Sequence, residues 1–564
     1  MTDIVQKINK HIAEAVKTAV AAAISKKALP EMELPSVNVE KPRGKNHGDF
    51  SCNIAMLLAK PARMAPRTIA MAIAENIPLN DNYIEKVEIA GPGFINFFIN
   101  DKWLYNTVEM IMELGDKYGE LDYGKGEKVM VEYVSANPTG PLHMGNARGG
   151  ALGDLIANVL DKAGYDVTKE FYVNDAGNQI EKFALSLELR YLQELNGVDS
   201  VEFPEDCYQG ADIIEHAKSY IASNLEDLAN KDSKYRKKKL VEYALPINIK
   251  NIGIGLKRYG IEFDNWFSEL SLHESGEVDE TIQLIKDNGF AIEKEGALWL
   301  KGEVLESEKD EVLVKSNGFK TYFAADLAYH RNKFIKRKFT RVINLLGTDH
   351  HAHAVRMKNA MPAMGIDKNK LDLVLFQLVR LMRGGETVRM SKRTGKAVSL
   401  NDLLDEIGVD AARFFFNMKA SGSHLDFDLD LAVKQSNENP VFYVQYAHAR
   451  ICSMLRILEQ EGIDVESDIC PPLEVLVAEE EKELMRKLAM YPQEILISAK
   501  TLEPGRLTRY VMDVAGAFHS FYNACRVKGE EESLMKARIT LVKATVIVIR
   551  NVLEVLSITA PEKM

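Results

Sequence analysis

Hydrophobic and polar positions follow two different periods in the first part of the chain. Apolar residues recur at helical spacing over 4–24, and a second helix is predicted over 49–60. Strand-like residues over 84–99 are interrupted by the turn Gly91-Pro92-Gly93. Residues 1–112 are therefore predicted to form an N-terminal α+β domain.

Short apolar runs alternate with helical segments in the middle of the chain. The runs 128–134, 167–173, 341–346 and 373–379 are typical of the buried strands of a parallel sheet. Polar residues follow each run, and open α/β sheets bind ligands at the carboxyl ends of their strands. The pattern predicts an α/β fold with a Rossmann-type parallel sheet in a catalytic domain over 113–436, interrupted by an insertion at about 187–314.

The last part of the chain is almost entirely helical in pattern. Apolar repeats run over 441–458, 474–497, 508–522 and 533–558. A C-terminal all-α helix bundle over 437–564 is the predicted architecture.

Composition narrows the class of protein. The 564 residues are 46% hydrophobic with a mean hydropathy of −0.17, and no apolar run is long enough to span a bilayer. Since the N-terminus also lacks a secretory pattern, we expect a cytoplasmic protein with no membrane contact. The five cysteines are scattered without a Cys-x-x-Cys pair, so we expect neither zinc nor a disulfide framework. A net charge of −11 means that any nucleic-acid partner must be bound through local patches.

A loop shaped for a nucleotide follows the first of the four runs. His143 and Asn146 lie one turn apart at the start of a helix, where free N–H groups and the helix dipole favour phosphate. Gly145 has no side chain, which lets a flat adenine ring approach the backbone. A strand, loop and helix capped for packing alone is the alternative interpretation.

A second loop is crowded with positive charge. It follows the strand near 373–381 and contains Arg389, Met390, Ser391, Lys392 and Arg393. The loop suits phosphate binding, and by itself it suits a solvated basic turn even better.

Together, and in this order, the two segments resemble the His-Ile-Gly-His and Lys-Met-Ser-Lys-Ser signatures of class I aminoacyl-tRNA synthetases. Asn146 stands where the second His is usual, and Arg389 and Arg393 replace the first Lys and the last Ser. Asn still donates a hydrogen bond and Arg389 keeps the charge, so neither change removes the chemistry. The whole chain, from the segment 47–50 to the segment 560–564, resembles the arginyl-tRNA synthetase family.

The resemblance implies an aminoacyl-tRNA ligase that attaches arginine to its tRNA in an ATP-dependent reaction through an arginyl-adenylate. The expected partners are ATP with Mg²⁺, L-arginine and tRNA, and a monomer is expected. The resemblance implies that His143, Asn146 and Lys392 are catalytic. It assigns ATP binding to Gly145, Arg389, Met390, Ser391, Lys392 and Arg393. We see no dedicated carboxylate cluster for the metal, so phosphate oxygens and water would supply its ligands.

The resemblance also implies an arginine pocket. Glu132 and Asn137 would lie near the amino and carboxylate groups of the substrate, and Tyr322 and Asp326 would face its guanidinium. Tyr322 and Asp326 are four residues apart and share a helix face. The alternative is that Asp326 caps or pairs within its own helix. His350 stands where relatives carry Gln, and we favour polar contacts over a zinc site for the cluster 349–353.

RNA contacts are implied for three parts of the chain. The N-terminal domain resembles a module that touches the tRNA elbow, and the basic run 234–239 suits either the acceptor stem or a solvated helix face. The C-terminal bundle resembles an anticodon-binding domain, in which Tyr443, Tyr446 and Arg450 are candidates for contacting unstacked bases. Tyr at helical spacing is more often part of a core.

Other classes of protein fit the sequence less well. A small-molecule nucleotidyltransferase would not need the helical domain, and a non-catalytic RNA-binding relative would lose signature residues. A glutamyl-type synthetase would require Arg in its amino-acid pocket, and a cysteinyl-type enzyme would require zinc-binding Cys. Neither pattern is present.

Overall fold

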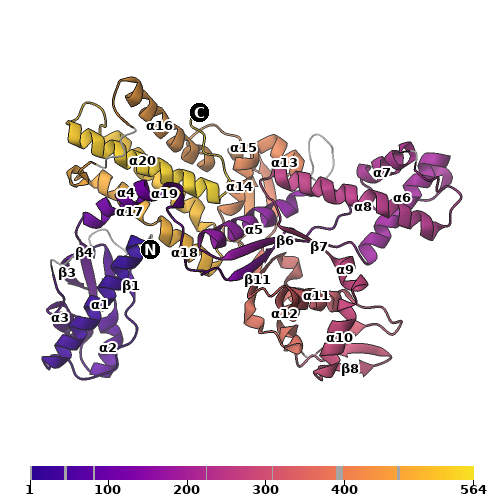
Figure 1. The fold of residues 1–564 in the computed structure, drawn as a ribbon, viewed down its shortest axis with the longest axis horizontal. Helices are drawn as coiled ribbons and strands as arrows, with labels where there is room; N and C mark the ends of the chain where they lie inside the picture. Colours follow the sequence, from indigo (N-terminus) through magenta and orange to yellow (C-terminus); the bar gives the residue numbers. More distant parts are fainter. Residues whose placement is uncertain are drawn as a thin grey trace.

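The computed structural model describes residues 3–42, 47–79, 83–223, 225–307, 309–388, 398–465 and 471–564. Figure 1 shows an elongated molecule in which the N-terminal domain lies at one end and a parallel sheet lies near the centre. The C-terminal helices lie along one side of the sheet, and two lobes extend at the other end. Within the described ranges, no helix has both the length and the apolar character needed to cross a membrane.

The central sheet has five strands in the order β12-β11-β5-β6-β7, and every neighbouring pair is parallel. The predicted Rossmann-type sheet is confirmed. The strand β7 lies inside the segment that was expected to be an insertion, because its four half-buried residues are too few to stand out as an apolar run. The strands are β5 (Lys128–Glu132), β6 (Asp166–Val173), β7 (Asn265–Ser268), β11 (Arg341–Gly347) and β12 (Leu371–Phe376).

The helix α5 (Met144–Lys162) follows β5 and is buried on nearly all sides. It packs against β5, β6 and β11 on one side and against α14 (Val409–Asn417) and α18 (Tyr491–Thr501) on the other. Small residues allow the close approach. A Cβ on Gly149 would lie 2.7 Å from the ring of Phe376. The start of this helix is therefore fixed relative to the strand ends.

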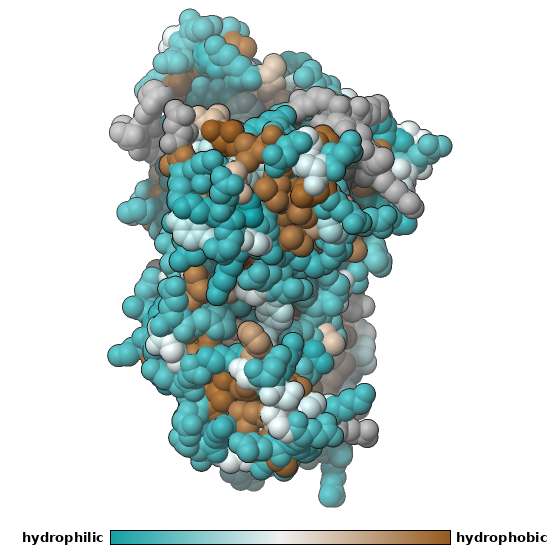
Figure 2. Space-filling view, turned by 90° about the vertical axis from the view of Figure 1, so that its right-hand side faces the viewer, coloured by the Kyte–Doolittle hydropathy of each residue, from teal (hydrophilic) through white to brown (hydrophobic). Residues whose placement is uncertain are grey.

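Two lobes flank the sheet beyond β6 and β7. The first lobe has its own apolar core and consists of α6 (Asn178–Asn196), α7 (Ala211–Ala222) and α8 (Ser233–Arg258). The second packs α10 (Glu277–Asp287) on the antiparallel strands β8 (Ala291–Lys294), β9 (Ala297–Leu300) and β10 (Glu311–Val314). The surface at this end is mainly hydrophilic, with separate apolar patches (Figure 2).

The basic run 234–239 lies on α8. Arg236 is buried and donates from Nε to Glu188 at 2.9 Å, and Lys239 pairs with Glu242 at 2.9 Å. Much of the run's charge is thus neutralised within its own lobe. This finding favours a structural role for the run over RNA contact.

The N-terminal domain packs helices on a sheet of order β1-β2-β4-β3. The predicted helix over 49–60 starts too early, because Phe50–Cys52 forms β2 and pairs with β4, a distant segment that local periodicity does not reveal. The turn at 91–93 between two strands is confirmed. The elements are α1 (Ile4–Ser25), β1 (Val39–Glu40), β2 (Phe50–Cys52), α2 (Ile54–Ala62), α3 (Pro66–Ala74), β3 (Ile84–Ala90) and β4 (Phe94–Ile99).

The C-terminal part is the predicted helix bundle. The apolar repeat over 474–497 forms two helices, because the chain breaks at Met490 and Pro492 belongs in the first turn of a new helix. The bundle packs on α4 (Lys102–Leu114) and α5, so its core is continuous with that of the catalytic domain. Its helices are α16 (Pro440–Gln460), α17 (Glu479–Ala489), α18, α19 (Arg506–Ala524) and α20 (Glu532–Val555).

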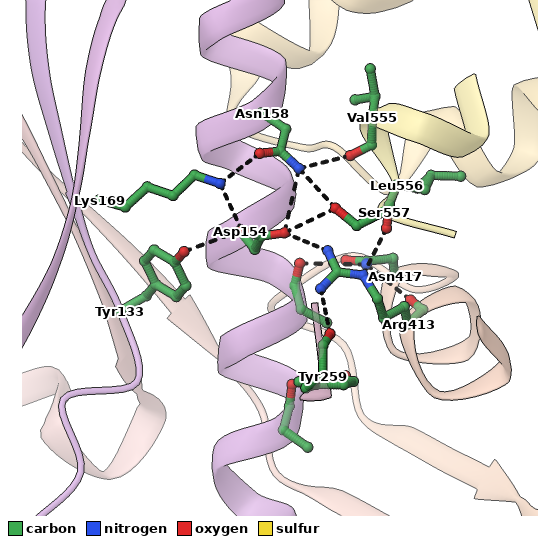
Figure 3. A network of polar contacts seen from close by, with 12 residues as sticks. Tyr133, Asp154, Asn158, Lys169, Tyr259, Arg413, Asn417, Val555, Leu556 and Ser557 are labelled. Carbon is green, nitrogen blue, oxygen red and sulfur yellow. Dashed lines mark hydrogen bonds and ion pairs between the residues drawn. The ribbon is translucent and has the colours of Figure 1, made fainter. Parts of the chain in front are cut away.

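A buried polar network joins α5 to the end of α20 (Figure 3). Arg413, on α14, donates to the Asp154 carboxylate at 2.5 Å and to the carbonyl of Leu556 at 2.8 Å. Asn158, one turn after Asp154, donates to the carbonyl of Val555 at 3.0 Å. The network fixes the C-terminal end of the bundle to α5, the helix that His143 caps.

Candidate active site

The chain makes a strained turn where it leaves β5. Val134 and Ser135 have φ angles of +67° and +40°. This left-handed conformation is rare for a β-branched residue, costs on the order of 1–3 kcal/mol and is concentrated at functional sites. The turn aims the Ser135 hydroxyl at Glu132 (3.2 Å), while the same oxygen accepts the backbone N–H of Tyr172 (3.2 Å). The end of β5 is thereby shaped around Glu132.

His143 caps the start of α5. Its Nδ1 accepts the backbone N–H of Gly145 at 3.0 Å, and its own N–H donates to Asn146 Oδ1 at 3.3 Å. Partial burial lowers the pKa of His143, so the ring is neutral and carries its proton on Nε2. A Cβ on Gly145 would lie 2.8 Å from this ring. Gly145 therefore makes room for the His143 ring, a reason that the sequence did not suggest.

The chain just after the second predicted signature lies against the first signature. His143 and Ser399 form an antiparallel bridge, and the N–H of Leu400 donates to the carbonyl of Leu142 at 2.9 Å. Ser399 directly precedes α13 (Leu400–Ile407) and follows the basic loop closely. The loop residues Arg389, Met390, Ser391, Lys392 and Arg393 lie outside the described residues. The chain that leaves their loop is nonetheless hydrogen-bonded to the start of α5.

Arg148 ties the first signature to the strand that leads into the basic loop. Its side chain is fully buried and donates to the carbonyls of Gln377, Ser423 and Ala420 at 2.8, 2.9 and 2.9 Å. Gln377 lies just before β13 (Val379–Arg383), which pairs with β14 (Glu386–Val388). One buried guanidinium on α5 thus holds the start of this helix next to the chain that leads into β13 and β14.

Tyr322 and Asp326 lie on α11 (Tyr322–Arg331), as the spacing predicted. Thr321 caps this helix, since its hydroxyl accepts the N–H of Ala324 at 3.3 Å, so Asp326 is not the cap. Asp326 pairs instead with Nε2 of His353 at 2.6 Å, and this bond raises the pKa of His353. The Tyr322 hydroxyl accepts the N–H of Asn178 at 2.8 Å.

The structure adds Glu269 and Tyr172 to this group. Glu269 begins α9 (Glu269–Glu274) at the carboxyl end of β7 and is 3% exposed. Burial raises its pKa to about 7, and the charges of Asp326 and Asp175 contribute to the rise. The Tyr172 hydroxyl, at the end of β6, bonds to Glu269 and lies in the fields of Asp326 and Glu132. Because the sequence pattern did not predict β7, it did not indicate that Glu269 lies in this group.

Asn137 and His350 are placed at the same edge of the sheet. Asn137 is exposed, and its amide lies 3.1 Å from that of Asn174, which follows β6. His350 is exposed at the end of β11, with Nε2 3.5 Å from Asp349. Within the predicted cluster 349–353, it is His353 whose side chain bonds to Asp326. Within the same ranges, no three His, Cys, Asp or Glu side chains are grouped to hold a metal ion.

Comparisons with known proteins decide the family. Residues 6–99 match the family model for the arginyl tRNA synthetase N terminal domain, and 107–429 match that for the tRNA synthetases class I (R) catalytic domain. The chain belongs to the arginyl-tRNA synthetase family. Residues 444–564 match the DALR anticodon binding domain. An arginine–tRNA ligase from Acetivibrio thermocellus is 64% identical over all of both chains, and one from Caldanaerobacter subterraneus is 54% identical over all of both chains.

Solved structures agree. A putative arginyl-tRNA synthetase from Campylobacter jejuni has a TM-score of 0.75 at 30% identity, covering 82% of this chain and 100% of its own. The arginyl-tRNA synthetase of Thermus thermophilus has a TM-score of 0.75 at 20% identity, covering 99% of this chain and 100% of its own, and shows the shared fold. The predicted class I resemblance is confirmed, although Asn146 replaces a signature His.

The three residues predicted to contact the anticodon form one cluster between α16 and α19. The Arg450 guanidinium lies 4.6 Å from the ring centroid of Tyr446 and 4.8 Å from that of Tyr522. Tyr443 packs on His519 with ring centroids 4.9 Å apart. All five side chains are at least partly exposed, so the cluster combines packing within the bundle with a cationic, aromatic surface.

Proposed function

We propose that the carboxylates at the ends of β5 and β7 and on α11 bind arginine while the start of α5 and the basic loop bind ATP. As an arginyl-tRNA synthetase, the protein is an ATP-dependent arginine–tRNA ligase that forms an arginyl-adenylate. The observation that carries the proposal is that Tyr172 connects two of these carboxylates: its hydroxyl bonds to Glu269, and its backbone N–H donates to Ser135, which donates to Glu132. Such a concentration of carboxylates suits a ligand with a cation at each end.

The guanidinium of arginine would be bound by Asp326 and Glu269, with Tyr322 beside it. A carboxylate accepts two parallel N–H bonds from a guanidinium, and such charge-assisted bonds are about twice as strong as neutral ones. Glu132 would accept the α-ammonium and Asn137 would donate to the α-carboxylate. We keep His350 as a further polar contact at the mouth of the pocket.

Activation joins an oxygen of the arginine carboxylate to the α-phosphorus of ATP and breaks the bond to pyrophosphate. The carboxylate is itself the nucleophile, so no side-chain base is needed. The His143 Nε2–H and the amide of Asn146 would donate to the phosphates or the ribose, beside the free N–H groups of the helix start.

The basic loop would stabilise the departing pyrophosphate. Lys392 and Ser391 would hold its β- and γ-phosphates, Arg389 and Arg393 would add positive field, and Met390 and Gly145 would line the nucleotide. Mg²⁺ would arrive with the ATP. Since the described residues hold no cluster that fits the ion by itself, we assign no step to a metal held by the protein.

tRNA would be bound along the length of the molecule. The C-terminal bundle would take the anticodon at Tyr443, Tyr446 and Arg450, and the N-terminal domain would touch the elbow. A monomeric state and a cytoplasmic location stay predictions.

ATP–pyrophosphate exchange with each amino acid in turn, with and without total tRNA, tests the proposal. We expect exchange with arginine and with no other amino acid, and only when tRNA is present. Faster exchange with any other amino acid would contradict the pocket assignment. Equal exchange without tRNA would contradict only the requirement for tRNA.

A further inference from the structure

Lys333 is a fully buried lysine next to the proposed arginine pocket. Its side chain is 0% exposed and forms an ion pair with Glu132, which is itself mostly buried. The same Nζ donates to Asn344 Oδ1 at 3.2 Å and lies 4.0 Å from the ring centroid of Tyr329. An ammonium without water is costly unless it is paired and hydrogen-bonded, so this arrangement calls for an explanation.

The backbone around Lys333 is unusual as well. It lies in a π-helical segment, Asn332–Lys336, that directly continues α11. Single π-helical turns inside α-helices are rare and occur frequently at functional sites. Asp326 lies near the start of α11, and Lys333 lies in the π-helical segment at its other end, where it contacts Glu132.

A directed chain of hydrogen bonds leads from Lys333 back to Asp326. Asn344, which accepts from Lys333, donates from Nδ2 to His330 Nε2 at 2.9 Å. His330 then donates from Nδ1 to the backbone carbonyl of Asp326 at 2.8 Å. Burial, together with the nearby Lys333 charge, holds the pKa of His330 well below its ordinary value. The ring is neutral, as an acceptor at Nε2 requires.

The neighbouring buried carboxylate already has another partner. Glu170 accepts bonds from Arg337 and from the hydroxyl of Tyr329. Burial alone would raise its pKa, but Arg337 and Lys333 together lower it. Arg337 makes the direct ion pair with Glu170, and Lys333 makes its direct ion pair with Glu132.

We propose that Lys333 is a positioning residue for the amino-acid substrate, which fixes the Glu132 carboxylate to accept the arginine α-ammonium. Asn344 and His330 connect this carboxylate to the segment of α11 that bears Asp326, so the groups for the two ends of arginine are held in one buried network. The inference rests on the proposed role of Glu132. Lys333 itself does not touch the substrate.

The physical reason is orientation. Lys333 and Ser135 hold Glu132 from two sides, which limits the rotamers open to it before arginine binds. Without the ammonium, Glu132 keeps, among the described residues, only the contact from Ser135 and is free to turn away from the substrate. A reoriented Glu132 no longer forms the charge-assisted bond with the α-ammonium, and such bonds contribute roughly tenfold to a hundredfold in affinity.

The test compares arginine with 5-guanidinopentanoic acid, which lacks only the α-ammonium. Dissociation constants are measured by calorimetry on the full-length protein and its Lys333→Met, Lys333→Arg and Glu132→Gln variants. We expect Lys333→Met to weaken arginine binding by roughly tenfold or more while changing 5-guanidinopentanoic acid little. Lys333→Arg keeps the charge and should retain part of the preference for arginine over 5-guanidinopentanoic acid. Unchanged binding of 5-guanidinopentanoic acid also shows that the variant is folded.

A double variant separates positioning from general damage. If Lys333 acts through Glu132, adding Lys333→Met to Glu132→Gln costs no further arginine affinity, because the two changes are not additive. It also leaves no unpaired buried charge, so it keeps the test valid if the single variant does not fold. If Glu132→Gln loses the preference for arginine over 5-guanidinopentanoic acid and Lys333→Met keeps it, the role of Lys333 is overturned while the proposed role of Glu132 stands. A full preference in Glu132→Gln overturns the proposed role of Glu132 itself.

Discussion

Asp154 and Arg413 form an ion pair in which both side chains are buried, with 1% and 0% of their surface exposed. The pair lies where α5 meets α14 and the end of the C-terminal bundle (Figure 3). Burial alone would raise the pKa of Asp154, but Arg413 and Lys169 lower it. Its contribution to stability is therefore present above the unfolded pKa near 3.8 and is lost as the pH falls through the lower folded value.

Arg413→Met should destabilise the protein by about 3 kcal/mol, because it leaves the Asp154 charge buried with Lys169 as its remaining cation. Denaturant unfolding of the full chain measures the loss. Arg380→Met is the matched control, since Arg380 pairs with Asp426 on the surface, at 64% and 53% exposure, where such pairs contribute less than about 1 kcal/mol. Equal losses in the two variants would contradict a special role for the buried pair.

Arginine binding should strengthen as the pH rises towards about 7. The pKa of Glu269 is about 7 in the ligand-free protein, and a bound guanidinium lowers it, so binding below that pH releases a proton. The same raised pKa means that its contribution to stability is present below about 4.5 and is lost as the pH rises through 7.

Calorimetry between about pH 5.5 and 8.5 tests the Glu269 assignment, with Glu269→Gln as the comparison. Tyr172, Asp326, Asp175 and His273 face the same carboxyl group and remain in the variant. We expect the variant to bind more weakly and with a flatter pH profile. A profile as steep as that of the parent protein would assign the titration to another group, such as His353.

Asp326→Asn should abolish the preference for arginine over citrulline. A neutral amide no longer rewards the charged guanidinium and does not accept two N–H bonds at once. Exchange rates with the two amino acids give the ratio. Asp349→Asn is the control, because Asp349 is 71% exposed next to His350 at the same edge of the sheet. A variant at 326 that still rejects citrulline fully would remove Asp326 from the selectivity site.

Lys392→Ala should slow arginine activation by a factor that corresponds to about 3 kcal/mol, with little change in arginine affinity. The ammonium acts on charge that grows as pyrophosphate departs. Lys396→Ala, in the same loop, is the control for a general effect of positive charge. Equal effects of the two substitutions would show that the loop acts only through its overall field.

The sequence predicted those features that depend on local pattern and failed where distant segments meet. The apolar runs identified four of the five strands of the central parallel sheet. The spacing of Tyr322 and Asp326 identified a shared helix. The strand β7 is too short and only half-buried, so the carboxylate that follows it, Glu269, escaped notice. Lys333 looked like any basic residue after a helix, because its burial depends on Glu132, far away in the chain.

The last prediction concerns the link between the anticodon end and the pocket. Removal of 437–564 is a poor test, because the bundle shares its core with α4 and α5 and the network around Asp154 would lose its partners at 555–557. Tyr446→Ala is sharper. If Tyr446 stacks on an anticodon base, its loss weakens tRNA binding by roughly 1–3 kcal/mol.

Tyr446→Phe keeps the ring and removes only the hydroxyl that accepts from Arg450 at 2.7 Å, so it should retain most of the affinity for tRNA. In Tyr446→Ala, exchange at limiting tRNA should fall with tRNA occupancy and recover at saturation, while the activity of the pocket itself is intact. This pattern follows from binding linkage, in which tRNA that completes the pocket affects activation only through its occupancy. Exchange that stays low at saturating tRNA would instead show that Tyr446 acts on the catalytic helix through the bundle.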